Sequence, residues 1–448
     1  MSEGAVSAEA QAPAAWLADL GEARLDHEPE SVRAMRARGL ERFSERGFPR
    51  PNEEDWRFTN VAAVARTRFL RPPAGIDTAA AGRALASAGL AHCHEVVFVD
   101  GRHVPELSSP GVPPAGVAVH SLARARPADW EAFGAELGRR ADVVNRPFAA
   151  LATGLFEDGA VIDFAPGAVV ETPVHLIFWS SAHAQPTATF PRVLVRAGEN
   201  ARATVVESYR GAARGVTLVC PVTELVAEAG AAIDHYKLQH ESLDAFHLAL
   251  FHVEAGRGAN VSSQTFSLGA AIARHDVQAV LGGEGAEVTL NGLYLVRGRQ
   301  LADFHMRVDH ARAHTTSHEL FKGVLDERAR GVFNGRIHVH PQAQKTDAKQ
   351  TSRNLLLSAE ALVNANPQLE IFADDVRCTH GSTVGQLDDQ AIFYLRSRGI
   401  GLEAARSLLT YAFAADIVER TRVEPLRRQL QEFLLAWIPH GEVVREAV

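Results

Sequence analysis

A thiol and an imidazole stand two positions apart at Cys378 and His380, on a segment whose pattern predicts a β-strand. Successive side chains of a strand alternate between its two faces, so both groups would point to one side, with their Cα atoms roughly 7 Å apart. Sulfur and imidazole nitrogen are donors that suit iron, zinc or copper(I). Two donors do not complete a tetrahedral site, so either another chain supplies the remaining ligands or the pair binds no metal.

The elements that would position this pair fall into three parts. Helical patterning covers about residues 14–70 and about residues 129–155. From about residue 160, short runs of Val, Ile, Leu and Thr are separated by Gly and Ala turns, and after Gly385 the pattern becomes helical again. We therefore predict a mainly helical N-terminal domain over residues 1–157, a β core over residues 158–385, and a helical C-terminal domain over residues 386–448.

The β core contains an internal repeat. A turn followed by a strand begins at Gly230 and recurs at Gly258 and Gly285, at intervals of 28 and 27 residues. Short strands that repeat at this length cannot bury their apolar face singly, but stacked coils form a continuous core. The repeat favours a parallel β-helix. A large antiparallel sandwich, whose strands also come in short runs bounded by glycine, is the alternative.

The C-terminal helices carry an apolar stripe. Asp388 or Asp389 fits the cap of a helix that runs through Arg396, and further helices are expected from Leu402 and after Pro425. Such a stripe usually packs on the next helix of its own chain, and in a minority of proteins it also serves as a partner surface. The stripe consists of Ala405, Leu408, Leu409, Ala412 and Phe413.

The bulk composition excludes several classes of protein. The chain has 448 residues, of which 46% are hydrophobic and 22% charged, as in globular rather than disordered proteins. A net charge of -8 argues against a primary role in nucleic-acid binding. Three cysteines without a CxxC motif make a disulfide framework unexpected and favour a cytoplasmic location. Residues 1–17 lack the features of a signal peptide, and no apolar run reaches membrane-spanning length.

Six ordered sequence blocks resemble the SufB/SufD family, and within it the SufD branch. The resemblance is dense over about residues 321–409, thinner through the rest of the β core, and carried near the N-terminus by EDWRFT at residues 54–59. Several ordered blocks are a far more specific signal than one short motif. The blocks are NGRI at residues 334–337, AQKTDA at 343–348, RNLLL at 353–357, PQLEI at 367–371, DVRCTHG at 375–381 and FYLRSRGI at 393–400.

The resemblance implies a right-handed parallel β-helix flanked by helices, and a cytoplasmic scaffold without enzymatic activity in iron-sulfur cluster assembly. It implies SufB and the ATPase SufC as partners, with a homodimer of the isolated chain left open. No lysine follows the spacing of a phosphate-binding P-loop, so ATP hydrolysis would belong to another subunit. The family docks the ATPase on the C-terminal segment, which in this chain is the stripe together with Arg396, Arg398 and Leu402.

The same resemblance decides between two interpretations of Cys378 and His380. A buried cysteine and a hydrogen-bonded structural histidine are the ordinary interpretation of such a pair. The family, however, places this histidine at the interface with SufB. Cys378 and His380 are therefore predicted to hold iron or a nascent cluster transiently, with the partner completing the ligand set, and no tightly bound cofactor is expected.

Other polar groups are interpreted as structural. His338 and His340 repeat the spacing of the first pair, but the family pattern does not require them. We interpret them, together with His310, His314 and His318, as structural or solvent-facing, and Cys93 and Cys220 as packing residues.

A stand-alone β-helix enzyme that acts on a polysaccharide is the alternative from another class. It would need an acidic or basic cluster in a groove, which the sequence does not show, although Lys345, Thr346 and Asp347 could be taken for a catalytic set. We interpret these three residues as a hydrogen-bonded corner of a coil. A homodimeric solenoid without a metal function is a third possibility.

Overall fold

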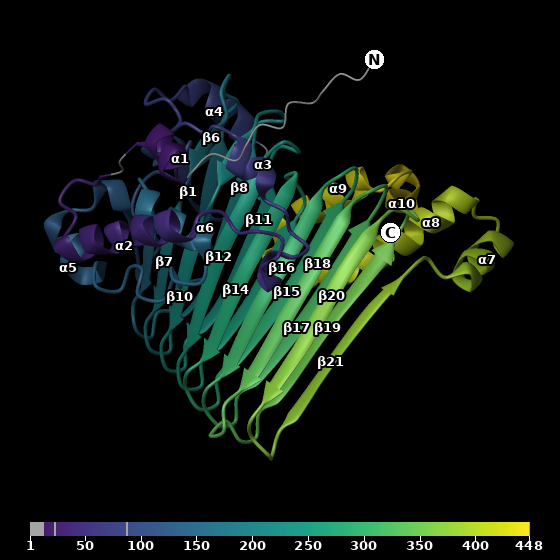
Figure 1. Ribbon diagram of the computed structural model, residues 1–448. Helices are drawn as coiled ribbons and strands as arrows, with labels where there is room; N and C mark the ends of the chain where they lie inside the picture. Colours follow the sequence, from purple (N-terminus) through teal and green to yellow (C-terminus); the bar gives the residue numbers. More distant parts are fainter. Residues whose placement is uncertain (1–12, 22–23, 87, 448) are drawn as a thin grey trace.

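Two layers of mostly parallel strands coil into one solenoid with the N-terminal and C-terminal helices packed on its outside, in a computed structural model that describes residues 13–21, 24–86 and 88–447 (Figure 1). Most of the segment tested for a signal peptide, residues 1–17, lies outside the described residues. The helices are α1 (Pro13–Leu20), α2 (Glu30–Arg46), α3 (Ala62–Arg66), α4 (Thr78–Leu85), α5 (Pro127–Phe133), α6 (Pro147–Leu155), α7 (Asp389–Ser397), α8 (Leu402–Val418), α9 (Glu424–Trp437) and α10 (Gly441–Ala447).

The strands form two sheets, in each of which neighbouring strands pair in the following order. The first sheet contains β2 (Arg102–His103), β1 (His94–Val99), β5 (Val174–Ser180), β8 (Arg202–Gly211), β11 (Ala232–His240), β13 (Asn260–Ser267), β15 (Glu287–Val296), β17 (Thr316–Leu325), β19 (Asp347–Leu356) and β21 (Arg377–Gly385). The second contains β20 (Leu362–Ile371), β18 (Arg330–Val339), β16 (Leu301–His310), β14 (Ile272–Leu281), β12 (Phe246–Ala255), β10 (Val222–Ala227), β7 (Arg192–Ala197), β4 (Gly159–Phe164) and β3 (Val117–Ser121). Two short strands, β6 (Thr187–Thr189) and β9 (Thr217–Val219), pair beside β12.

The predicted repeat is confirmed as the coil of a β-helix. Gly230, Gly258 and Gly285 each occupy a turn two residues before a strand, with φ between 62° and 70°, a region that glycine enters without a steric penalty. The strands after them, β11, β13 and β15, pair in parallel and in register. The antiparallel sandwich is wrong, because the long strands of both sheets pair in parallel, and among the described strands antiparallel pairing is confined to β1 with β2 and β3 with β4.

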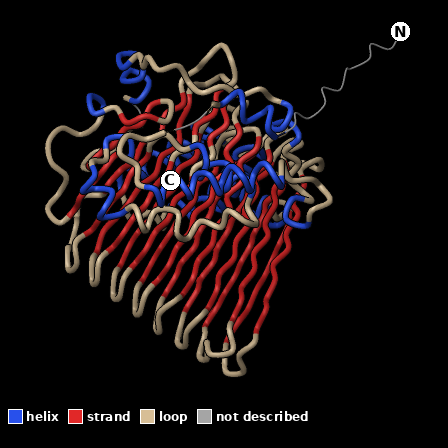
Figure 2. The backbone as a smooth tube through the Cα atoms, turned by 60° about the vertical axis from the view of Figure 1, so that its left-hand side comes forward, coloured by secondary structure: helices blue, strands red, loops and turns tan. Residues whose placement is uncertain are grey.

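The core lies between the two sheets, in the lumen of the solenoid. Inward-facing side chains of equivalent strands stack into columns; the rings of Phe98, Phe178 and Tyr209, for example, follow one another with centroids 4.8 Å apart at each step. Such columns bury apolar area that one coil alone would expose. Figure 2 shows the long strands side by side with their turns aligned at one end.

The N-terminal helices pack over the first coils, and one of them differs from the prediction. The sequence predicts a single helix over residues 129–155, but α5 and α6 are separate. Between them, the carboxylate of Glu224 on β10 accepts hydrogen bonds from the backbone N–H groups of Gly138, Arg140 and Ala141, at 2.7–3.1 Å. These N–H groups are therefore committed to a side chain of the solenoid, so they cannot continue a helix.

The C-terminal helices lie against the outer face of the first sheet. α8 contacts β15 and β17, and its buried face joins that of α9 in one apolar cluster. Asp388 caps α7 by accepting from the backbone N–H of Gln390 at 2.9 Å, as the sequence predicted. Within the described residues, no helix is both long and apolar enough to cross a membrane.

The division of the chain at residues 157 and 385 stays a prediction. β1 lies before residue 158 and already pairs in parallel with β5, so the ladder of the first sheet includes part of the N-terminal region. Helices α7 to α10 all follow residue 385.

Candidate functional site

The predicted metal-binding pair lies on β21, the last strand of the first sheet. β21 pairs in parallel with β19, and the register places Cys378 beside Ala348 and His380 beside Gln350. Ala348 and Gln350 are each 1% exposed, and Cys378 packs against the core of the lumen. By strand alternation, the pair therefore continues the inward-facing columns of the solenoid.

The burial of these columns changes abruptly at β21. Cys378 is half-buried and His380 is exposed, although their neighbours one coil earlier are buried. Of the strands that the structure describes, none pairs with β21 on its far side, and β20 ends the second sheet in the same way. We call these two strands the open edge. Unpaired N–H and C=O groups of an edge strand are available for pairing with another chain.

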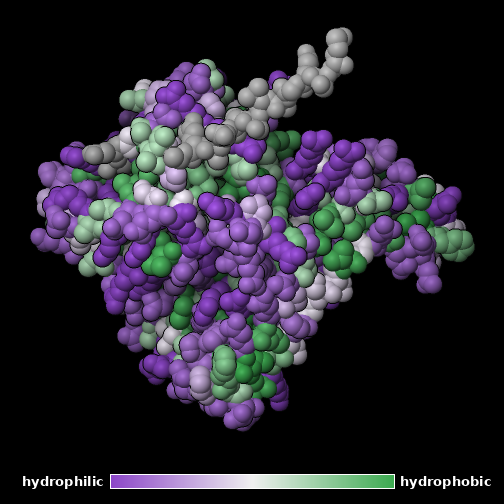
Figure 3. Space-filling view, in the orientation of Figure 1, coloured by the Kyte–Doolittle hydropathy of each residue, from purple (hydrophilic) through white to green (hydrophobic). Residues whose placement is uncertain are grey.

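Large apolar side chains are also exposed at the open edge. Four such side chains lie on these two strands and the turn between them, and the least exposed of the four, Ile371, is 40% exposed. Figure 3 shows hydrophobic side chains gathered over the turns at the lower end of the last coils and along the C-terminal helices. Two of the four residues lie at the turn between β20 and β21, and two lie near the opposite ends of these strands, so they follow the whole length of the edge. Exposed apolar side chains along an edge mark a surface where another macromolecule binds. The residues are Leu362, Ile371, Phe372 and Val384.

The protonation of Cys378 matters because the thiolate, not the thiol, binds a metal. Partial burial raises the pKa of the Cys378 thiol, and the nearby carboxylate of Asp347 adds to this, while a backbone hydrogen bond from Ala348 lowers it in part. The free thiol is therefore protonated at neutral pH. A metal ion that binds sulfur at this position would displace the proton.

Cys378 and His380 offer too few ligands for a complete coordination sphere. In the described part of the chain, neither belongs to a group of three donor residues close enough to hold one ion. The group that does meet this condition is Asp309, His338 and His340, on a different face of the solenoid. Binding of iron or a cluster at Cys378 and His380 would thus require donors from outside these residues.

A buried carboxylate that the sequence analysis missed lies in the same column as His380. Glu319 on β17 pairs in register with Gln350, which in turn pairs with His380. Burial raises the pKa of Glu319 to about 7, although its hydrogen bond from Gln350, at 2.7 Å, acts in the opposite direction. Strand alternation in the sequence identifies the residues of β17 that face inward. It does not show which residues of the neighbouring coils lie in the same column.

The remaining candidates occupy structural positions. His310 is buried and hydrogen-bonded to Thr315 and Ser317 at 2.8 and 2.9 Å, whereas His314 and His318 are exposed, so these three histidines do not share a face. Cys220 is buried in an apolar cluster and Cys93 is half-buried. At the predicted corner, Lys345 forms an ion pair with Asp375 of the next turn, and Thr346 is buried beneath it.

The stripe on α8 divides between two environments. Ala405 is fully buried, and Leu408 and Phe413 pack against the cluster shared with α9. Leu409 is half-buried and lies outside that cluster, and Ala412 and Leu402 are exposed. Arg396 and Arg398 on and after α7 are exposed, and Arg398 lies over the ring of Tyr394 at 4.7 Å. One part of the predicted surface is therefore committed to the fold, and another part faces outward.

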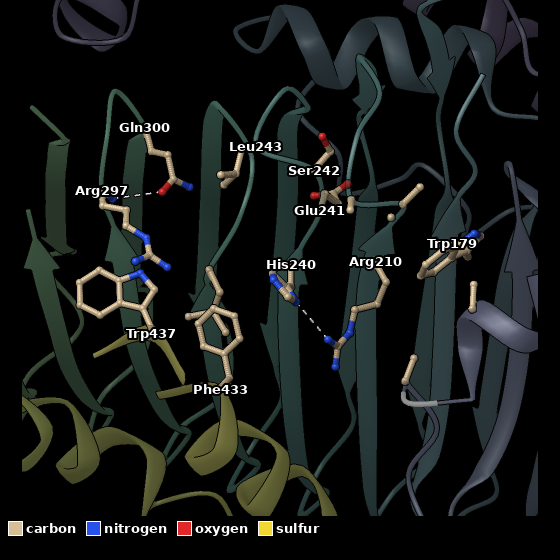
Figure 4. A pocket seen from close by; sticks show the side chains of 16 residues that line it. Trp179, Arg210, His240, Glu241, Ser242, Leu243, Arg297, Gln300, Phe433 and Trp437 are labelled. Carbon is tan, nitrogen blue, oxygen red and sulfur yellow. Dashed lines mark hydrogen bonds between the residues drawn. The ribbon is translucent and has the colours of Figure 1, made fainter. Parts of the chain in front are cut away.

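A cavity of about 420 Å³ lies between α9 and the solenoid, away from the open edge (Figure 4). Its basic groups contact other residues of the chain: Arg210 donates to Gln429 at 2.5 Å and lies 3.2 Å from Nδ1 of His240, and Arg297 lies over the ring of Trp437. Burial lowers the pKa of Arg210 to about 10. These contacts fasten α9 to the strands.

Comparisons with known proteins agree with the sequence blocks. The chain matches the family described as SUF system FeS cluster assembly, SufBD core domain, over residues 178–413, and the SufBD protein N-terminal region over residues 21–176. It is similar to the iron-sulfur cluster assembly protein SufD of Escherichia coli, with 32% identity over 90% of this chain and 92% of that protein. It is also similar to SufD of Bacillus subtilis, with 26% identity over 90% and 93%, and to a SufBD family protein of Synechocystis, with 31% identity over 86% of each chain.

Proposed function

The chain belongs to the SufBD family of iron-sulfur cluster assembly proteins, and from this premise we propose that it is a scaffold subunit that works with a SufB protein and a SufC ATPase. The position of Cys378 and His380 on the open edge carries the proposal. A strand or coil of a second chain stacked on β21 would cover both residues and bring further donors beside them. The chain itself then needs no enzymatic activity.

In this proposal Cys378 and His380 supply part of the ligand set for iron or a nascent cluster, which is the cargo of the complex. Thiolate and imidazole are both ligands of iron-sulfur clusters. Because burial raises the pKa of the Cys378 thiol, binding would couple to loss of a proton. The exposed apolar residues of the open edge would provide the driving force for the contact with SufB.

The ATPase would dock on the outward part of the C-terminal helices. Figure 1 shows α7 projecting from the body of the protein. Its aromatic residues Phe393 and Tyr394 are 74% and 55% exposed, next to Arg396 and Arg398. Aromatic and arginine side chains are enriched at the centres of protein interfaces. Movement of the ATPase would then reach the open edge through α7, which follows β21 directly in the chain.

The experiment that tests the site is anaerobic cluster reconstitution on the complex with SufB and SufC. We expect His380→Ala to leave assembly of the complex intact and to lower cluster yield by about tenfold, because one ligand of an incomplete set is removed. Iron and sulfide per complex, with the visible absorption of the cluster, report the yield. His318→Ala removes another exposed histidine and serves as the control. A normal yield for His380→Ala would remove His380 from the site.

The docking surface is tested by pull-down of the ATPase. Leu409→Glu places a charge on the part of α8 outside the apolar cluster, so we expect a folded protein that no longer retains SufC. Leu430→Glu, on the buried face of α9, is the matched control and should unfold the C-terminal helices instead. If Leu409→Glu also unfolds them, the stripe serves packing alone, and if it still retains SufC, the docking surface lies elsewhere.

A further inference from the structure

Three donor groups converge on the outer face of the second sheet. Asp309 lies on β16, His338 lies beside it in register on β18, and His340 follows β18 directly. Each of the three offers one donor atom, and these atoms all lie within 4.8 Å of one another. All three residues are half-buried, so the group is neither sealed in the core nor freely mobile on the surface.

Neighbouring side chains orient two of the three donors. Glu370, the residue beside His338 on β20, lies with a carboxylate oxygen 2.9 Å from Nδ1 of that imidazole. A carboxylate at Nδ1 fixes the tautomer with its proton there and leaves Nε2 free for a metal. Arg307 donates two hydrogen bonds of 2.8 Å to the two carboxylate oxygens of Asp309, which holds this group in one orientation.

The spacing of the group suits an ion better than a direct hydrogen bond. Nε2 of His340 lies 3.9 Å from Oδ1 of Asp309, which is too far for a hydrogen bond. It is, however, within the span of two metal–ligand bonds of about 2.1 Å each. The rings of His338 and His340 meet nearly at right angles, with centroids 4.5 Å apart.

We propose that Asp309, His338 and His340 form a binding site for a divalent transition-metal ion, with Glu370 and Arg307 as positioning residues. Two imidazoles and one carboxylate with open positions are the donor set of non-haem Fe(II) centres, and Zn(II) accepts the same ligands. Of these two ions we choose Fe(II), and this choice rests on the proposed function. Arg307 occupies one face of the Asp309 carboxylate and leaves the remaining lone pairs available to the ion.

The site lies beside the turn that joins the two strands of the open edge. The ring of His338 packs against Phe372 with centroids 5.3 Å apart, and the backbone N–H of Phe372 donates to the carbonyl of Val339 at 2.9 Å. Phe372 begins the turn between β20 and β21, which continues into Cys378. An ion held on the outer face would thus lie beside the chain segment that carries the predicted cluster ligands.

The test is anaerobic titration of the full-length isolated chain with Co(II), followed by visible ligand-field absorption, and with Fe(II) in competition. We expect one equivalent to bind, with loss of the signal in the double variant His338→Ala, His340→Ala and in Asp309→Asn. Glu370→Gln should weaken binding by about 10–100-fold, as loss of an orienting carboxylate does. Thermal unfolding of each variant shows whether it folds, and the near-isosteric Asp309→Asn and Glu370→Gln variants carry the test if the double variant does not.

Two controls distinguish this site from the predicted cluster ligands Cys378 and His380. His318→Ala removes an exposed histidine on β17, and the pair Cys378→Ala, His380→Ala removes the predicted cluster ligands; both should retain full Co(II) binding. Equal binding by the wild type and Asp309→Asn, an adventitious ion only, would overturn the proposal, as would loss of binding in the Cys378, His380 variant. Partner pull-downs are independent of this titration. If the chain binds Co(II) at this group but retains no SufB, the metal site stands and the choice of Fe(II) as its ion, which rests on the proposed function, fails.

Discussion

The two ends of the solenoid are built from the same coil and have opposite surroundings. At the N-terminal end, Arg192 and Glu224 form an ion pair at 2.5 Å with both residues almost wholly buried, beneath the chain's own helices. At the open edge, the inward-facing positions of β21 are half-buried or exposed. Positions of the coil are therefore buried where another part of the same chain covers them. Where that cover is missing, the same pattern of residues becomes an exposed surface.

The contrast extends to carboxylates inside the lumen. Glu207, near the N-terminal end, accepts hydrogen bonds from Tyr209 and Thr223 and lies 3.0 Å from Nε2 of His235. Burial raises the pKa of Glu207, but the hydrogen bond and charge of His235, the charge of Lys237 and the hydrogen bond from Tyr209 together outweigh this, so its pKa lies below the usual value. Glu319 receives a hydrogen bond from Gln350, and burial raises its pKa to about 7. Of these two buried carboxylates, Glu207 is therefore fully paired, whereas one oxygen of Glu319 has no partner among the described residues.

The largest expected effect on stability is at the closed end. Glu224→Ala would leave Arg192 as a buried charge without its carboxylate and would remove the acceptor for three backbone N–H groups between α5 and α6. Breaking a buried ion pair in this way costs about 3–5 kcal/mol. Urea unfolding measures the loss. Glu284→Ala, in an exposed turn, is the control and should change the free energy of unfolding by less than about 0.5 kcal/mol. A similar small change for Glu224→Ala would mean that the N-terminal helices are not fastened by this carboxylate.

The second effect depends on pH. The folded protein keeps a proton on Glu319 up to about pH 7, whereas the unfolded chain loses it near the ordinary glutamate pKa of 4.5. The unfolded state therefore binds fewer protons in this window, and the free energy of unfolding falls as pH rises from about 4.5 to 7. We expect Glu319→Gln to remove this fall and to be more stable than the wild type at pH 8, by an amount on the order of 1–3 kcal/mol.

Glutamine also fits the hydrogen bonding of the position. The Oε1 atoms of Glu319 and Gln350 both lack a partner in the described part of the chain, and an amide at position 319 has an N–H to donate to Gln350. Glu241, whose pKa burial also raises to about 7, titrates in the same window in both proteins. The measurement is therefore the difference between the two stability curves from pH 4.5 to 8. Parallel curves would show that Glu319 is ionised in the folded state.

The sequence supported the fold better than it supported the sites. The glycines at 230, 258 and 285 predicted the coil, because each turn needs a left-handed residue at the same place. The columns were not predictable, since the coil length varies: paired residues are 27 apart for Val261 and Val288 and 31 apart for Ser317 and Ala348. Because of this variation, the sequence did not show that Glu370 lies beside His338, or that Glu319 lies in one column with Gln350 and His380. Similarly, the break between α5 and α6 depends on Glu224, a distant residue that no local pattern reveals.

The smallest expected effect on stability tests the open edge itself. Val384 is 48% exposed on β21, so Val384→Asp should change the free energy of unfolding of the isolated chain by less than about 0.5 kcal/mol. In contact with a second chain the same carboxylate would be buried without a partner, and we expect SufB retention to fall by at least about tenfold. Val112→Asp, at an 89% exposed valine in the N-terminal region, is the matched control and should retain SufB fully. Because both variants add one charge to one exposed valine, a difference between them locates the interface. Equal retention would mean that the partner does not cover β21, and the exposure of Cys378 and His380 would then need another explanation.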